Sequence, residues 1–367
     1  MTALLEPARL GSTPLRNRLV MAPLTRNRAT AHGVPRSIMR TYYAQRASAG
    51  MIVAEAATPN VVGRTYPNIT AIYGPEHVAG WRRVTDAVHA EGGRMFLQIQ
   101  HGGRVGHPET SGHIPLAPSP IPLPGTIVTP NGHRPTVMPR EMTADDIAAT
   151  VADFAQGARN AMAAGFDGVE VHGANGYLIH QFMSGNTNHR SDGYGGDAEG
   201  RTRFAVEVIK SVAEAIGPGN VGFRVSPYGT ANGIEEADTE DIYDTLFAAL
   251  QGLDLAYAHV AFADPGTPTF NTIRASWHRP LIANPKLPLD RLPDDGGKAA
   301  GERLIEAGAD LVSFGRAFLA NPDLVERLRI DAPLNPVRDK GLMYTGDENG
   351  YIDYPTLAES AAQTVAT

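Results

Sequence analysis

The densest group of chemically useful side chains lies in segment 172–177, which reads H-G-A-N-G-Y. His172 and Asn175 both offer N–H donors, and two donors aimed at one oxygen atom can polarise a carbonyl group or bind a phenolate. Tyr177 adds a weak acid that could donate a proton. The spacing fits a second interpretation equally well, in which a buried histidine is satisfied by the backbone and lies beside a core tyrosine.

Other polar side chains follow short apolar runs elsewhere in the chain. Gln98, His101, Arg224, Asn284 and Arg316 each come at or just after the end of such a run. The planar fork of an arginine suits a phosphate dianion, so Arg316 and the glycine before it form a candidate phosphate site. The alternative for this arginine is an ion pair with a surface carboxylate.

A metal-hydrolase site is the competing kind of enzyme site. His101, His172 and Asp264 are conceivable ligands for a metal ion. The chain contains no H-x-H or H-E-x-x-H spacing, however. We therefore expect no metal.

The elements that must position these groups alternate along the chain. Apolar runs typical of strands buried on both faces are found at 18–22, 51–55, 94–100, 168–172, 221–225, 255–261, 280–283 and 311–315. Helical periodicity is found between them at 37–48, 76–91, 143–164, 199–216, 239–251 and 298–307. This alternation predicts an α/β fold with a single (β/α)8 TIM barrel over residues 1–367. A doubly wound sheet is the competing fold, but no G-x-G-x-x-G motif lies between a strand and a helix.

Long connections are expected on one face of this barrel. Functional groups of such barrels gather at the C-terminal ends of the strands, where the polar side chains above are found. Residues 102–140 are rich in proline, glycine and histidine, and a connection of this length predicts a cover over the site. Segments 264–278 and 284–297 are expected to be irregular loops on the same face. Residues 335–367 form a C-terminal tail that we expect to fold back onto the barrel.

The composition restricts the class of protein. With 32 basic and 39 acidic residues, the chain has no bulk attraction for nucleic acid. The lack of cysteine excludes disulfides, zinc thiolate sites and a catalytic thiol. There is no signal-peptide pattern and no apolar run of about 18 residues. We therefore expect a cytoplasmic protein without membrane attachment, either a monomer or a small homo-oligomer.

Several motifs together resemble the Old Yellow Enzyme family, and within it the bacterial alkene-reductase branch. They are M-A-P-L-T-R at 21–26, Y-A-Q-R-A-S-A-G at 43–50, F-D-G-V-E-V-H-G-A-N-G-Y-L-I-H-Q at 166–181, Y-G-G at 194–196, R-V-S-P at 224–227, F-G-R at 314–316, A-N-P-D at 320–323 and G-Y-I-D-Y-P at 350–355. Each motif alone is weak. The ordered set is specific, and it extends from about residue 5 to residue 357.

The resemblance implies a barrel that binds FMN and takes electrons from NADPH or NADH. The residues that it and the barrel rule assign to FMN are Pro23, Leu24, Thr25, Ala56, Gln98, Arg224, Asn284, Gly315 and Arg316. Among them, Gln98 matches the amide at the pyrimidine edge of the flavin. Arg224 matches the cation beside N1 and O2, and Arg316 matches a phosphate contact. The segment A-N-P-K-L at 283–287 departs from the family, which has glycines in this phosphate loop.

The resemblance also assigns a substrate site. His172 and Asn175 match the donor pair that binds the substrate's activating oxygen, and Tyr177 matches the proton donor. Tyr66 and Tyr351 match aromatic residues that line the substrate pocket. Gln100 stands where the family often has tryptophan, which places a smaller, polar side chain at the pocket.

The activity implied is that of an ene-reductase, which reduces the activated C=C bonds of enones, maleimides and nitroalkenes. Two alternatives would use the same residues. One is a reductase of nitrate esters or nitroaromatic compounds, and the other is a flavin-binding protein without turnover.

Overall fold

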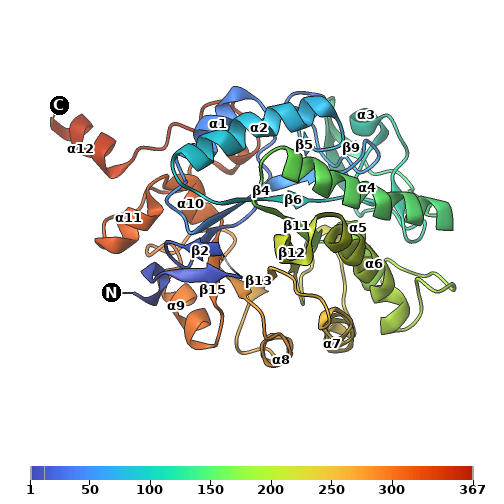
Figure 1. Cartoon of the computed structure of the whole chain (residues 1–367). Coiled ribbons are helices and arrows are strands. Elements are labelled where there is room, and N and C mark those ends of the chain that lie inside the picture. The colour runs from blue at the N-terminus through green and yellow to red at the C-terminus, as the bar shows by residue number, and fades with distance from the viewer. Residues whose placement is uncertain (1, 12, 366–367) are drawn as a thin grey trace.

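The computed structural model describes residues 2–11 and 13–365, and in this part of the chain eight parallel strands close into a barrel (Figure 1). They are β3 (Leu19–Met21), β4 (Met51–Thr58), β6 (Met95–Ile99), β11 (Gly168–Gly173), β12 (Val221–Val225), β13 (Tyr257–Ala263), β14 (Leu281–Pro285) and β15 (Leu311–Phe314). Each strand pairs with the next, and β15 pairs with β3 to complete the ring. The predicted (β/α)8 barrel is confirmed.

Helices connect consecutive strands and surround the barrel (Figure 1). They are α1 (Ser37–Ala44), α2 (Pro75–Ala90), α4 (Ala144–Ala163), α6 (Ala198–Ile216), α7 (Thr239–Leu250), α8 (Pro268–Ser276) and α9 (Lys298–Glu306), with α10 (Arg316–Ala320) and α11 (Leu324–Arg329) after β15. The expectation that 264–278 is irregular is wrong. The side chain of Thr267 accepts a hydrogen bond from the backbone N–H of Phe270 and begins α8, which buries Phe270 and Ile273 in the core.

The N-terminal end of the barrel is closed by apolar side chains. The interior cluster there includes Val20, Val53, Phe96 and Ile282. A hairpin of β1 (Ala8–Leu10) and β2 (Thr13–Leu15) packs Leu10 and Leu15 against this cluster. A larger apolar layer lies between the strands and the helices. Burial on both faces explains why the strands are continuous apolar runs, and it leaves the C-terminal end of the barrel for polar side chains.

Shorter helices and strands lie in the connections and at the chain ends. They are η1 (Ala3–Leu5), β5 (Thr70–Ala71), α3 (Pro108–Ser111), β7 (Leu116–Ala117), β8 (Thr126–Thr129), β9 (Gly132–Pro135), β10 (Arg140–Glu141), α5 (Leu178–Met183), η2 (Pro218–Asn220), η3 (Ala231–Gly233), η4 (Lys340–Met343) and α12 (Leu357–Val365). Of these, α3, β7, β8 and β9 lie within segment 102–140, and β10 begins at its last residue. The last two residues of the predicted tail, 366 and 367, lie outside the described residues.

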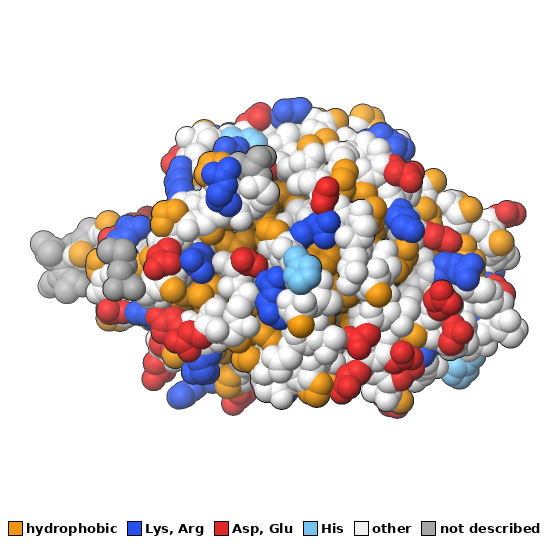
Figure 2. Space-filling view, turned by 60° about the horizontal axis from the view of Figure 1, so that its bottom comes forward, with side chains coloured by type: hydrophobic (Ala, Val, Ile, Leu, Met, Phe, Trp, Pro, Cys, Tyr) orange, Lys and Arg blue, Asp and Glu red, His pale blue; other side chains and the backbone are white. Residues whose placement is uncertain are grey.

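Charged side chains of both signs are interspersed on the face shown in Figure 2, with apolar side chains between them. Among the described residues, no helix has both the length and the apolar character needed to cross a membrane.

Candidate active site

A cavity of about 970 Å³ opens at the C-terminal ends of the barrel strands. Its wall includes the predicted residues Pro23, Leu24, Thr25, Tyr66, Gln98, Gln100, His172, Asn175, Tyr177 and Arg224. Small-molecule sites typically have volumes of roughly 300–1,000 Å³. The barrel therefore brings most of the predicted site into one cavity of suitable size.

His172 and Asn175 both lie in the wall of this cavity. His172 is the penultimate residue of β11 and is 3% exposed, and it lies beside Arg224 in the register of β11 with β12. Asn175 has a left-handed backbone (φ 57°), which asparagine tolerates better than most residues. Its N–H donates to Oγ of Ser226 (2.9 Å), and its carbonyl accepts from Nδ2 of Asn232 (2.8 Å). Within the described part of the chain, Nδ1 of His172 and Oδ1 of Asn175 have no hydrogen-bond partner.

The imidazole of His172 is neutral around pH 7. Burial, followed by the positive charge of Arg224, lowers the pKa of His172 to about 3. A neutral imidazole has one N–H donor, and the amide of Asn175 has two. The pair can therefore hold an oxygen atom of a bound molecule without carrying a net charge.

Tyr177 supplies a hydroxyl at the same wall. It lies at the N-terminus of α5, where the next residue, Leu178, donates its N–H to the carbonyl of His101 (3.0 Å). The rings of Tyr177 and His172 are 5.2 Å apart. Burial, and then the neighbouring Tyr66, raise the pKa of Tyr177 well above its ordinary value. The hydroxyl therefore stays protonated and can act as a weak acid.

Arg224 and Gln98 form the floor of the cavity. Arg224 is 5% exposed, and its Nη2 donates to Oδ1 of Asn284 (3.0 Å). Gln98 is 3% exposed and donates through Nε2 to Oε1 of Glu170 (2.8 Å). Nε of Arg224 has no partner among the residues that the structure describes. A cation and an amide with a free oxygen are thus available to a ligand on the floor.

Two buried arginines, Arg26 and Arg28, bind the C-terminal tail. Arg26 donates to the carbonyls of Met343 (2.8 Å) and Gly350 (2.7 Å). Arg28 donates to the carbonyls of Leu342 (2.8 Å) and Met343 (3.1 Å). These bonds place residues 341 and 343–345 in the cavity wall.

Tyr351, predicted to line the substrate pocket, is not among the residues of the cavity wall. Its side chain is fully buried and stacks on Tyr42, with ring centroids 4.1 Å apart, and the guanidinium of Arg26 lies 4.9 Å from its ring. The tail tyrosine that lines the cavity is Tyr344, which is 49% exposed.

The segment predicted as a cover forms one side of the cavity. Thr110, Val128, Thr129, Pro130 and His133 line it. The carboxylate of Glu109 holds the β8–β9 hairpin, because it accepts hydrogen bonds from Oγ1 of Thr129 (2.7 Å) and Nε of Arg134 (3.1 Å).

Comparison with known proteins shows the family of this chain. Residues 3–335 match the model of the NADH:flavin oxidoreductase / NADH oxidase family. The chain belongs to this family. It is 40% identical over 365 residues to a probable flavin mononucleotide-dependent alkene reductase of Leishmania infantum, covering 96% of this chain and 97% of the relative.

Solved structures point the same way. The Old Yellow Enzyme homologue from Zymomonas mobilis superimposes with a TM-score of 0.91 at 37% identity, covering 97% of this chain and 100% of that one. Morphinone reductase in complex with tetrahydroNAD superimposes with a TM-score of 0.90 at 40% identity, covering 97% and 98%. The resemblance to the Old Yellow Enzyme family is confirmed, and the chain is an FMN-dependent oxidoreductase.

The cavity suits the ring of FMN. The pyrimidine edge of a flavin combines carbonyl acceptors with an N–H donor, and it becomes negatively charged on reduction. The cation of Arg224 complements this edge, and so does the amide oxygen of Gln98, whose N–H₂ group donates to Glu170. The residues present therefore fit the flavin ring of the cofactor.

The residues expected at the phosphate lie outside the wall of the cavity. Gly315 and Arg316 begin α10, and Arg316 donates to the carbonyl of Leu289 (3.2 Å) and contacts that of Pro288. Both ends of the Asn284 amide are occupied, since Nδ2 donates to the carbonyl of Ser313 (2.8 Å). A phosphate contact for Arg316 stays a prediction, and it requires this side chain to leave the carbonyls of the loop after β14.

Two other predicted residues have defined places. Ala56 is buried where the register of β4 with β6 shifts, and its carbonyl accepts from Oγ1 of Thr70 (2.8 Å). Gln100 lines the cavity, and its buried Nε2 has no partner in the described part of the chain. In the described structure Gln100 therefore leaves a buried, unsatisfied N–H₂ group in a residue of the cavity wall.

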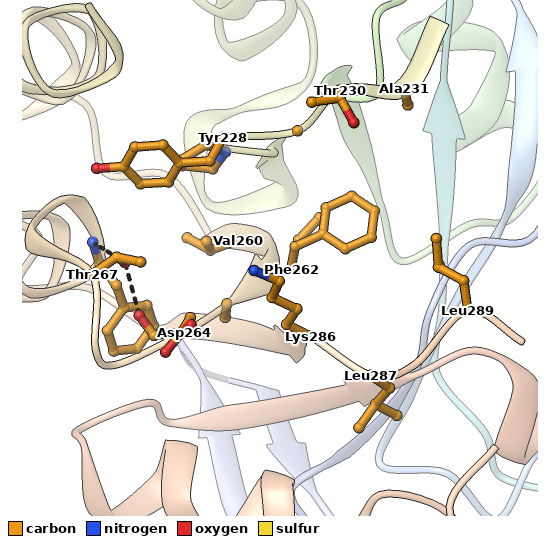
Figure 3. A pocket seen from close by; sticks show the side chains of 15 residues that line it. Tyr228, Thr230, Ala231, Val260, Phe262, Asp264, Thr267, Lys286, Leu287 and Leu289 are labelled. Carbon is orange, nitrogen blue, oxygen red and sulfur yellow. Dashed lines mark hydrogen bonds between the residues drawn. The ribbon is translucent and has the colours of Figure 1, made fainter. Parts of the chain in front are cut away.

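A second cavity, of about 470 Å³, is lined by residues at the ends of β12, β13 and β14 (Figure 3). Tyr228 and Phe262 flank it and have left-handed backbones (φ 60° and 54°). The loop that lines it continues to Asn232, which holds Asn175 of the first cavity. Asp264 lines this second cavity, apart from His172 and His101. Among the described residues, no group of three or more His, Cys, Asp or Glu side chains could hold a metal ion.

Proposed function

We propose that this FMN-dependent oxidoreductase is an ene-reductase that reduces electron-poor C=C bonds at the expense of NADPH or NADH. The observation that supports this most is the placement of a neutral donor pair, His172 and Asn175, and a protonated phenol, Tyr177, in the cavity whose floor suits a flavin. Reduction of an activated alkene needs these functions together. The curated relative from Leishmania infantum is named an alkene reductase, which agrees with the proposal.

The chain's own residues bind and activate the alkene. FMN, when bound, supplies the hydride. His172 and Asn175 donate hydrogen bonds to the activating oxygen of the substrate and withdraw electron density from the C=C bond, so the β-carbon becomes electrophilic. The hydroxyl of Tyr177 gives its proton to the α-carbon, since it is a protonated acid at the same wall. Arg224 stabilises the negative charge that gathers at the cofactor's pyrimidine edge on reduction.

The electron donor is a nicotinamide dinucleotide. The family description names NADH, and the morphinone reductase neighbour was solved with tetrahydroNAD. Donor and alkene use the cavity in turn, so turnover consists of two half-reactions.

Gln100 favours one kind of substrate within this class. Its free Nε2 is an N–H donor in addition to His172 and Asn175. A substrate with a second acceptor oxygen, such as a maleimide with two carbonyls or a nitroalkene with two nitro oxygens, can use it. An enone with a single carbonyl cannot.

Two measurements test the proposed activity. The purified protein should be yellow and release FMN when denatured. With NADPH or NADH it should then reduce 2-cyclohexenone, N-ethylmaleimide and a nitrostyrene to the saturated products. A flavin-loaded protein that oxidises the nicotinamide but reduces none of the three alkenes would refute the proposal.

A further inference from the structure

A fully buried carboxylate, Glu170, lies beneath the floor of the cavity. The register of β11 with β6 places Glu170 beside Gln98, and Oε1 accepts a hydrogen bond from Nε2 of Gln98 (2.8 Å). A carboxylate can only accept, so it fixes which way the amide points. The N–H₂ group of Gln98 faces Glu170, and its oxygen is left for the cavity.

The other oxygen of Glu170 contacts a buried histidine. Oε2 lies 2.7 Å from Nδ1 of His259, whose side chain is also fully buried. Burial, and then the charge of Arg224, lower the pKa of His259 to about 4, so its imidazole is neutral and has one N–H. Because the carboxylate needs a donor, that N–H is on Nδ1.

This tautomer leaves the lone pair on Nε2. Nε2 lies 2.8 Å from Oγ of Ser313. Nη1 of Arg224 contacts Nε2 and also lies 3.0 Å from Nδ1. With the proton on Nδ1, the single lone pair on Nε2 is the ring's one acceptor, and the Ser313 hydroxyl and Arg224 share it. The register of β12 with β13 places Arg224 directly beside His259. Arg224 is therefore held by Asn284 at Nη2 and by the lone pair of His259 at Nη1.

We propose that Glu170 and His259 are positioning residues that orient both groups facing the pyrimidine edge of FMN. Glu170 acts directly on Gln98, which it holds as a hydrogen-bond acceptor. It acts on Arg224 through the Nδ1–H tautomer of His259. The inference rests on the proposed contacts of Gln98 and Arg224 with the flavin.

The proposed effect of His259 on Arg224 is tested by comparing two substitutions in the FMN-loaded enzyme. Leucine has nearly the size of histidine but no acceptor, so in His259→Leu the guanidinium of Arg224 loses its partner. We expect the FMN dissociation constant to rise about 10- to 100-fold and the flavin midpoint potential to fall. In His259→Gln an amide oxygen can replace Nε2, so most of the affinity and of the potential should return. A purely packing role predicts that leucine is tolerated at least as well as glutamine, and that result overturns the proposal.

Arg224→Ala separates this inference from the flavin site on which it rests. Suppose Arg224→Ala changes the FMN affinity and the flavin midpoint potential but His259→Leu changes neither. The proposed effect of His259 on Arg224 is then wrong, and the flavin site stands. If Arg224→Ala changes neither, the proposed flavin contact itself is wrong.

The tautomer can be measured in the unmodified enzyme, so the inference does not depend on a variant that folds. Imidazole ¹⁵N chemical shifts should show His259 neutral and protonated on Nδ1 at pH 7. A signal from the Nε2–H tautomer, or from a doubly protonated ring, contradicts the proposed effect of His259 on Arg224.

The proposed effect of Glu170 on Gln98 is tested with a flavin that lacks the N3–H donor. 3-Methyl-FMN has no N3–H, so the wild-type enzyme should bind it more weakly than FMN. In Glu170→Gln the amide of Gln98 is no longer held in one orientation, and the ratio of the two dissociation constants should shrink. An unchanged ratio overturns the proposed effect of Glu170 on Gln98.

Discussion

The hydroxyl oxygens of Tyr66 and Tyr177 lie 3.4 Å apart in the wall of the active-site cavity. Both phenols are protonated, because burial raises the pKa of each. Tyr177 is also the closer of the two to the donor pair, since its ring packs against His172. The geometry therefore predicts different roles for two chemically identical side chains.

Tyr177→Phe should separate the half-reactions. Oxidation of NADPH or NADH needs no proton from this residue, so it should continue at nearly the wild-type rate. Reduction of 2-cyclohexenone should slow on the order of 10²- to 10⁴-fold, which is what general acid catalysis supplies. Nitroalkenes should be affected less, because the nitronate formed by hydride transfer is stable enough to take its proton from water. Stopped-flow absorbance of the flavin follows both half-reactions.

Tyr66→Phe is the matched control, since it removes a hydroxyl from the same wall but leaves Tyr177 intact. It should slow enone reduction far less. Equal losses in the two variants, or a collapse of nicotinamide oxidation in Tyr177→Phe, would mean that Tyr177 has a structural role.

Arg224→Ala should weaken FMN binding and make the flavin harder to reduce. The positive charge lies on the floor of the cavity, where a reduced flavin is anionic. Its loss should cost ~1–4 kcal/mol at an effective dielectric near 20 or above. Spectroelectrochemical titration gives the potential, and fluorescence quenching on reconstitution with FMN gives the affinity. Full flavin content with an unchanged potential is the contrary result.

Gln100→Leu should act on one class of substrate. The free Nε2 is lost at nearly constant volume, so kcat/KM for N-ethylmaleimide should fall roughly 3- to 10-fold, as for loss of one neutral hydrogen bond. The value for 2-cyclohexenone, which has one acceptor oxygen, should stay within about twofold of wild type. If both substrates lose equally, Gln100 shapes the pocket without donating to the substrate.

The barrel and most of the cavity could be predicted from the sequence because both depend on regular periods. Apolar runs mark the strands, and a polar residue at the end of a strand must face the C-terminal end of the barrel. The alternation of side chains along a strand would also have identified Glu170. Side chains two apart on a strand share a face, so Glu170 points into the barrel with His172. A carboxylate there must have partners.

The side-chain positions of the tail tyrosines could not be predicted in this way. Tyr344 and Tyr351 lie in irregular backbone, where no period sets the direction of a side chain. Their places depend on Arg26 and Arg28, which are more than 300 positions away in the sequence and bind the carbonyls of the tail. The helix α8 was missed for a related reason. Its short apolar face is recognisable only once the surface it packs against is known.

Glu55 gives a prediction about stability and pH. It is fully buried, accepts hydrogen bonds from the Tyr43 hydroxyl (3.2 Å) and the Arg26 N–H (3.3 Å), and burial raises its pKa to about 7. Its unfolded pKa is lower, so between about pH 4.5 and 7 the native state binds the extra proton. Stability from this group is complete below that window and is lost as the pH rises through it, by roughly 3 kcal/mol in total. Glu55→Gln cannot ionise. The unfolding free energies of wild type and Glu55→Gln are measured with urea from pH 5 to 8 at saturating FMN. As the pH rises, wild type should lose stability relative to Glu55→Gln.

Glu109→Gln is the control, because hydrogen bonds from Thr129 and Arg134 lower the pKa of Glu109 to about 2. Glu109 is essentially ionised in both states above pH 6, so this control should show no such trend there. A flat difference for Glu55→Gln would show that Glu55 is ionised throughout in the folded enzyme, paired with Arg26.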